Sequence, residues 1–147
     1  MKKKIEPAEL TPSEREEMIR LKVDVLKSMP DFIGSNGRSK EEIELAETML
    51  EVAFARDYRN YLEEIGLACF GGHELTGLTK TERLNVVTVT MEQRERFGKI
   101  TSTWYVIEET SIYGIVIWQD TDGFVYETAS NSKVKKVADS LSEYFTR

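Results

Sequence analysis

The sequence predicts an α+β fold in one domain, with N-terminal helices, a largely antiparallel twisted sheet and a C-terminal helix. Capped apolar stripes at helical spacing fill the first part of the chain, and runs of β-branched and aromatic residues divided by turn signals fill the second. The chain has 147 residues, of which 40% are hydrophobic and 31% charged. This balance suits one ordinary globular core spanning residues 1–147.

The first predicted helix begins at Thr11 and continues to about Ser28. Pro12 suits the first helical position, and Glu14 completes a capping box with Thr11. The apolar residues expected to line this helix are Met18, Leu21 and Val25. Residues 29–40 carry one proline and two glycines, which predicts a loop.

Two more helices are expected before the pattern changes. Ser39 and Glu42 form a second capping box, and an apolar stripe follows it at Ile43, Ala46 and Leu50. A third helix is predicted from about Arg56 to Ile65. It ends at Gly66, the residue type best suited to a left-handed C-terminal cap.

Short strands and one ambiguous segment follow Gly66. The pieces "LACF" and "HELTGL" flank Gly71-Gly72, which predicts two small strands and a tight turn. Residues 84–98 remain open, because the β-branched run from Val86 to Thr90 favours a strand. Asn85 and Gly98, however, are a suitable start and end for a helix.

The second half reads as a strand meander closed by a helix. Residues 101–109 and 111–119 are rich in aromatic and β-branched residues, and Asp122-Gly123 is the strongest hairpin signal before a third strand at residues 124–128. A C-terminal helix is predicted with one apolar face, made of Val134, Val137, Leu141 and Tyr144.

The charge distribution favours a basic protein partner over nucleic acid. The net charge is -6 and the isoelectric point is near 5.0, whereas a phosphate-tracking surface needs clustered Lys and Arg. Residues 100–132 contain no Lys or Arg but hold Glu108, Glu109, Asp120, Asp122 and Glu127. Such a face would speed the encounter with a basic protein. The alternative interpretation is that these acids form only the solvated rim of a sheet.

The location expected for the chain is the cytoplasm. A single cysteine cannot form an intrachain disulfide, so nothing indicates an oxidising compartment. Three lysines follow Met1, but no apolar signal-peptide core follows them. No stretch approaches the length of a membrane span, so no membrane partner is expected.

The only cysteine and the only histidine, Cys69 and His73, raise the question of a thiol–imidazole site. The two glycines between them disfavour a helix, although the side chains could still approach across a tight turn. The apolar setting "LACF" indicates an inert thiol instead. We therefore expect no catalytic residues and no enzyme, with a small thiol hydrolase kept as an alternative.

No metal or cofactor is expected either. Zinc sites need several Cys and His ligands, and this chain has one of each. Asp120, Asp122 and Gly123 resemble the opening of a calcium loop, but Asn131 stands where the loop requires glutamate. The glycines at 66, 71, 72 and 77 lack the Gly-Lys-Ser/Thr sequence of a phosphate loop.

The order of segments from Gly34 to Tyr144 resembles the SUKH superfamily, which includes a yeast cell-wall regulator family and many bacterial immunity proteins. The stretch from Glu42 to Glu47 is similar to the family's "E-I-x-x-A-E" helix core, and "FARDYRNYLEEIG" followed by "CFGGHELTGL" is similar to its third helix and glycine-rich strand pair. The matching positions there are Asp57, Tyr58, Leu62, Gly66, Gly71, Gly77 and Leu78.

Later segments extend this resemblance. Asn85-Val86-Val87 with Arg94 is similar to the family's "N-V-V" start and favours a helix for the ambiguous segment, and "WYVIEE", "IWQDTDG" and Tyr126 fit its strands. The stretch from Ala138 to Tyr144 resembles the closing helix, with Leu141 in place of phenylalanine. Two positions depart from the family pattern. Ala55 stands where the family usually has proline, and Trp118-Gln119 replaces the usual residues before Asp120.

The resemblance implies a family core at residues 34–147 behind an N-terminal helical extension at residues 1–33. It implies an immunity protein that neutralises a cognate polymorphic toxin domain, often a basic nuclease in this family, by stoichiometric inhibition. The alternative is an interaction module of the same family without a toxin partner. In the family, the glycine-rich stretch is a scaffold turn, and Cys69 and His73 are not signature residues.

Contact residues are expected where acids and aromatics gather, since aromatic side chains are favoured anchors in interfaces. Core or cross-strand packing is the alternative role of the strand aromatics. The residues that we predict to contact the partner are Glu74, Glu108, Glu109, Tyr113, Trp118, Asp120 and Asp122. This choice rests on charge and aromatic content and not on family residues.

Overall fold

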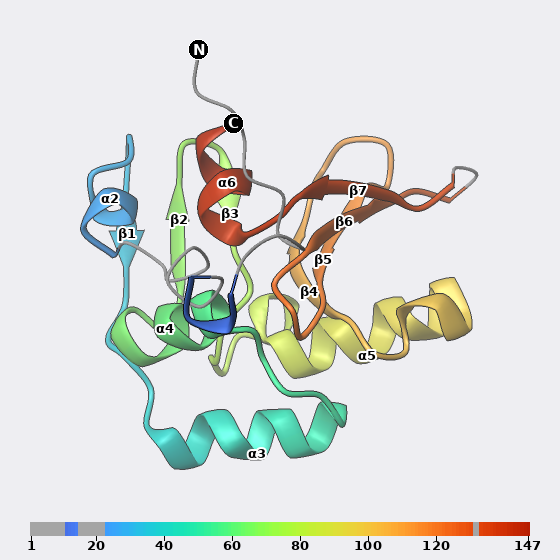
Figure 1. Cartoon of the computed structure of the whole chain (residues 1–147), viewed down its shortest axis with the longest axis horizontal. Coiled ribbons are helices and arrows are strands. Elements are labelled where there is room, and N and C mark those ends of the chain that lie inside the picture. The colour runs from blue at the N-terminus through green and yellow to red at the C-terminus, as the bar shows by residue number, and fades with distance from the viewer. Residues whose placement is uncertain (1–10, 15–22, 131–132) are drawn as a thin grey trace.

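The computed structural model describes residues 11–14, 23–130 and 133–147. Helices and two antiparallel sheets make up an α+β fold, with a helix at the C-terminal end of the chain (Figure 1). The predicted fold class is confirmed.

The first predicted helix, from Thr11 to about Ser28, falls only partly within the described residues. Thr11 and Glu14 form the predicted capping box, because each backbone N–H donates to the other residue's side-chain oxygen. Met18 and Leu21 lie outside the described residues. Helix α2 spans Val23–Lys27, and there Leu26 is buried while Val25 is exposed, so the predicted apolar stripe is wrong at Val25.

Helices α3 (Lys40–Leu50) and α4 (Arg56–Glu64) form as predicted. Ser39 and Glu42 close the capping box of α3, and Ile43, Ala46 and Leu50 are buried. Helix α4 buries four side chains, two of them tyrosines, and gives way to Gly66 at a φ of 79°. The left-handed conformation at that position explains the need for glycine.

A three-stranded sheet follows the order β1-β2-β3. Strands β2 (Ala68–Phe70) and β3 (His73–Glu74) form the predicted pair around Gly71-Gly72, whose φ angles are 51° and 84°. Strand β1 (Ile33–Gly34) lies within the segment predicted to be a loop and pairs antiparallel with β2. Its two residues are too short a run to give a sequence signal for a strand.

The ambiguous segment is a helix. The short 3-10 helix η2 (Glu82–Leu84) leads into α5 (Val86–Phe97), where Asn85 caps the first turn by accepting from the N–H groups of Val87 and Thr88. Helix α5 stops at Gly98 and continues as the 3-10 helix η3 (Gly98–Thr101). A good cap at each end outweighs the β-preference of the valines, because helix α5 buries them.

The larger sheet is an antiparallel meander, β4-β5-β6-β7. Strands β4 (Tyr105–Glu109), β5 (Val116–Gln119) and β6 (Val125–Thr128) match the three predicted strands, although β4 and β5 begin later than expected. Residues before Tyr105 belong to η3 and a turn, and residues 111–115 form a loop.

The predicted C-terminal helix is wrong over its first part. Residues Lys135–Ala138 form the edge strand β7, which pairs with β6, and helix α6 covers only Leu141–Thr146. Val134 and Val137 therefore do not share a helix face with Leu141. Pairing with β6 decides the conformation there, and Ser140 starts the helix by accepting from the Glu143 N–H.

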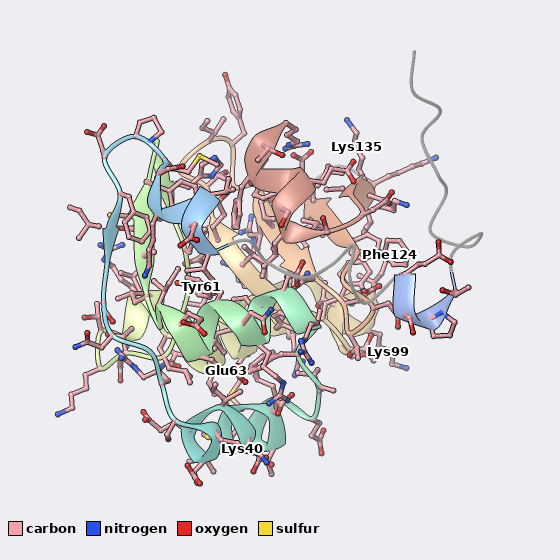
Figure 2. The ribbon with its side chains drawn as sticks, turned by 60° about the vertical axis from the view of Figure 1, so that its left-hand side comes forward. Lys40, Tyr61, Glu63, Lys99, Phe124 and Lys135 are labelled. Atoms are coloured by element: carbon pink, nitrogen blue, oxygen red, sulfur yellow. The ribbon has the colours of Figure 1, made fainter. Side chains whose placement is uncertain are left out.

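The meander is covered on both faces. Tyr105, Ile107 and Ile117 pack with α4 and α6 in the main core, whereas Val106, Val116 and Trp118 pack on the other face against Val89 and Phe97 of α5. Helix α3 lies beneath α4 and α5 and contacts both (Figure 1). Lys40 at the start of α3 and Lys135 on β7 lie at opposite edges of the molecule (Figure 2).

Candidate partner-binding surface

The predicted contact residues separate into two ends of the meander. Glu109 pairs with Val116 at the end that carries the β4–β5 loop, whereas Gln119 leads into the β5–β6 turn at the other end. Four residues of β5 lie between these ends, a distance of about 13 Å at 3.3 Å per residue. Tyr113 and Glu109 therefore lie at one end, and Asp120 and Asp122 at the other.

The β4–β5 loop exposes its aromatic residue fully. Tyr113 has 91% of its surface exposed and a φ of 50°, and its neighbour Ile112 is 59% exposed. Thr110 closes the base of the loop, since its hydroxyl donates to the Ile115 carbonyl at 2.9 Å and its N–H donates to the same oxygen at 3.0 Å. A tight base thus holds Tyr113 out from the protein.

Glu109 lies beside this loop and is exposed. The side-chain amide of Gln93, on α5, donates to its carboxylate. On the next turn of α5, Arg96 donates to Ser130 on the far side of the loop. Helix α5 therefore bonds to the last residue of β4 and to the segment after β6, and acid, base and aromatic groups gather near the loop.

The β5–β6 turn uses its acid internally. Asp120 Oδ1 accepts from the N–H groups of Asp122 and Phe124, both at 3.0 Å, and Oδ2 accepts from the Tyr126 hydroxyl at 2.9 Å. Such bonds build a hairpin turn and do not build the opening of a calcium loop. Asp122 is exposed at the turn. Burial, together with the nearby Asp120 and Asp122, raises the pKa of Tyr126 well above its usual range.

Two predicted contact residues are buried, which corrects their assignment to the surface. Trp118 is 0% exposed, and its indole N–H donates to the Thr128 hydroxyl at 2.8 Å. Glu108 is 4% exposed, because a β-bulge between Val106 and Glu108 turns its side chain to the face covered by α6. Cross-strand packing, the alternative for Trp118, is its role in the structure.

Glu108 anchors a buried polar cluster. His73 Nδ1 lies 2.8 Å from Glu108 Oε1, and the Tyr144 hydroxyl donates to the same oxygen. The hydrogen bond to this carboxylate raises the pKa of His73, and burial beside the carboxylate raises the pKa of Tyr144. The cluster joins β3, β4 and α6.

Cys69 is not part of that cluster. In the β2–β3 register, Cys69 faces Glu74 while Phe70 faces His73, so the thiol and the imidazole point to opposite faces of the hairpin. The Phe70 and His73 rings lie 5.5 Å apart, which agrees with this register. The geometry does not bring a thiol and its base together.

Glu74 and Glu127, the acid of β6, face basic residues. Arg83 binds the Glu74 carboxylate with both of its terminal nitrogens, at 2.6 and 3.0 Å, and this pair lowers the pKa of Glu74. Lys135 on β7 pairs across from Glu127, and the neighbouring Lys136 lies 2.6 Å from Asp139. The stretch without Lys or Arg therefore does not form a uniformly acidic face.

Sequence reasoning assigned no structural role to the buried carboxylate of Asp57. Gln119 Nε2 and the Tyr58 N–H donate to Oδ1 at 2.8 Å, and the Leu141 N–H donates to Oδ2 at 2.8 Å. Burial raises the pKa of Asp57 to about 6. In the sequence, only the match of Asp57 to the family motif pointed to this residue. In the structure, its carboxylate joins α4, β5 and α6.

Among residues 11–14, 23–130 and 133–147, no group of three or more His, Cys, Asp or Glu side chains could hold a metal ion. In the same described ranges, no helix has both the length and the apolar character needed to cross a bilayer.

A family model described as SUKH_5, SMI1-KNR4 cell-wall, matches residues 16–147. The chain belongs to the SUKH superfamily. The match includes the capped α3, the glycine turn and α6, and it begins within the segment predicted to be an N-terminal extension. No curated protein matches the chain.

Proposed function

We propose that this SUKH protein is a non-enzymatic, cytoplasmic immunity protein that binds a cognate toxin domain and inhibits it stoichiometrically. Family membership supports a role of this kind. The observation that carries the proposal is Tyr113, whose side chain is 91% exposed on a braced loop. Tyrosine is enriched among interface anchors, and full exposure of one on a monomer has no benefit for folding.

The partner proposed for this loop is basic, as a nuclease domain is. Glu109 lies next to the loop and would meet a basic rim around the pocket that receives Tyr113. The exposed Asp122 would contact such a partner only if the interface reaches the other end of the meander, about 13 Å away. The loop is the centre of the proposed interface, and the turn is its periphery.

The test is co-expression of the chain with the product of the adjacent gene, scoring cell survival and co-purification. The proposal expects wild-type protein to restore cell survival and to co-purify as a one-to-one complex. Tyr113→Ala combined with Glu109→Lys is expected to abolish both results, because these residues face solvent and contribute little to the fold. A fold check by circular dichroism accompanies each variant.

A matched control is Thr48→Ala, an exposed substitution on α3, remote from the loop. It should protect as wild type does. If no rescue and no complex occur with the wild-type chain, the toxin partner is wrong and the interaction module without a toxin replaces it. If both the wild-type chain and the loop variant restore survival, the protein is an immunity protein whose interface lies elsewhere.

A further inference from the structure

Arg96 on α5 holds its guanidinium group against the β4–β5 loop. The group donates to the Ser130 hydroxyl, and its central carbon lies 4.9 Å from the centre of the Phe97 ring. Gly114 closes a third side, because a β-carbon at this position would lie 3.1 Å from Nη2 of Arg96. Helix α5, the loop and the segment after β6 together fix the direction of an exposed arginine beside Tyr113.

The groups that hold Arg96 are neutral. In the part of the chain that the structure describes, no carboxylate forms an ion pair with Arg96, whereas Arg59 and Arg83 each bind a glutamate. Glu109 beside the loop accepts instead from the side-chain amide of Gln93. A guanidinium has five N–H donors, and a single hydroxyl oxygen cannot satisfy them. The charge of Arg96 is therefore available to a partner.

The acid nearest to Arg96 along α5 does not neutralise it. Glu92 precedes Arg96 by four residues, which is the spacing at which ion pairs form on a helix. The guanidinium turns towards Ser130 and Phe97 instead. A pair between two exposed side chains at this spacing would also be weak, so it would not compete with a carboxylate enclosed in an interface.

A carboxylate on a partner protein is the group that fits this arginine. The planar guanidinium matches the two oxygens of a carboxylate, and a side chain that is already held loses less freedom on binding. Arginine is enriched, as tyrosine is, among the residues that dominate binding in protein interfaces. A phosphate would fit the guanidinium too, but Glu109 nearby and a net charge of -6 oppose the binding of nucleic acid.

We propose that Arg96 determines partner specificity by binding a carboxylate of the toxin domain, beside the pocket that receives Tyr113. This inference rests on the proposed function for the identity of the partner. A matching toxin presents a basic group to Glu109 and an acidic group to Arg96. A basic domain without that acid leaves Arg96 opposite a like charge or no charge, and it binds less tightly. The charge pattern at the loop thus separates one basic partner from another.

The test uses the purified full-length chain and the product of the adjacent gene, with Kd measured by calorimetry and rates by stopped flow. Arg96→Ala makes the chain more negative by one charge, and this change alone would speed association with a basic partner and tighten binding. We expect the opposite effect on Kd, a rise of about 10-fold caused by faster dissociation. Lys40→Ala is the matched control, because it removes the same charge from a 76% exposed side chain at the start of α3. It should bind at least as tightly as wild type.

Two further variants separate recognition from folding. Arg96→Lys keeps the charge and should recover only part of the lost affinity, because lysine lacks the planar guanidinium. Arg96→Gln keeps a donor for Ser130 and gives the same test as alanine if Arg96→Ala unfolds, which circular dichroism checks. Stability should change little in each, since Arg96 is exposed.

The outcomes distinguish this inference from the proposed function. A wild-type complex whose Kd is equal or lower in the folded Arg96→Ala or Arg96→Gln variant would overturn the role of Arg96 and leave the proposed function standing. Absence of any wild-type complex would overturn the proposed function and the role of Arg96 together.

Discussion

The two ends of the β4–β6 meander contain the same kinds of residue and use them differently. At the β5–β6 turn, Asp120 satisfies two backbone N–H groups and the Tyr126 hydroxyl. At the β4–β5 loop, Thr110 hydrogen-bonds to Ile115 at the base, and Tyr113 is left 91% exposed. The comparison teaches that similar residues have different surroundings: the acid and the tyrosine of the turn bond to each other, whereas the tyrosine of the loop stays exposed, and this exposure makes the loop the proposed contact surface.

The largest expected effect on stability comes from Trp118, which lies on β5 between the two ends. Trp118→Ala removes a side chain with 0% exposure and its hydrogen bond to Thr128. The free energy of unfolding should fall by about 4 kcal/mol, as for other buried tryptophans. Urea denaturation measures this. A loss below 1 kcal/mol would mean that Trp118 is not a core residue and would return it to the contact surface.

The second largest loss of stability is expected for Asp120→Ala at the β5–β6 turn. The variant leaves two turn N–H groups and one tyrosine hydroxyl without their acceptor, which should cost about 2 kcal/mol of unfolding free energy. Toxin binding per molecule of folded protein should change little. A variant that keeps wild-type stability and loses binding would reverse the roles of the two ends.

The His73–Glu108 contact predicts a dependence of stability on pH. The hydrogen bond to the Glu108 carboxylate raises the pKa of His73 above its ordinary value near 6.5. The folded state therefore favours the protonated imidazole, and this contribution is complete below about pH 6.5 and is lost as the pH rises through the folded pKa.

Urea unfolding of wild type and His73→Gln at pH 5.5 and pH 8.5 measures this contribution. The stability difference between the two proteins should be larger at pH 5.5 than at pH 8.5. An equal difference at both values would show that protonation of His73 is not coupled to folding. The cluster would then act only through packing.

The smallest expected effect on stability is at the β4–β5 loop. Tyr113 holds a φ of 50°, where glycine has no steric penalty, and its side chain makes little contact with the protein. Tyr113→Gly should therefore leave the free energy of unfolding within about 1 kcal/mol of wild type, on the stabilising side. Thermal unfolding checks this, and a marked loss of stability would show that the tyrosine serves the fold.

The sequence predicts the elements whose signals are local. Ser39, Asn85 and Gly66 mark helix ends by their own chemistry, and the structure confirms each of them. Strand β7 is different, because Val134 and Val137 fit a helical spacing with Leu141 as well as they fit a strand. Only pairing with β6, a tertiary contact, decides between the two.

The candidate site was predictable in its composition and not in its exposure. Tyr113 and Glu109 were selected correctly as exposed residues, but Glu108 was selected by the same argument and is buried. A β-bulge turns Glu108 inward, and no residue type in "WYVIEE" signals that bulge. The position of Lys135 across from Glu127 was equally unpredictable, since it depends on strand β7, which the sequence did not reveal.

The most direct test is the affinity of the purified chain for the product of the adjacent gene, measured for wild type and Tyr113→Ala. We expect a one-to-one complex and a rise in Kd of about 30-fold in the variant, equivalent to about 2 kcal/mol, with thermal stability unchanged. Equal affinities for the two proteins would contradict the claim that the exposed end of the meander carries recognition.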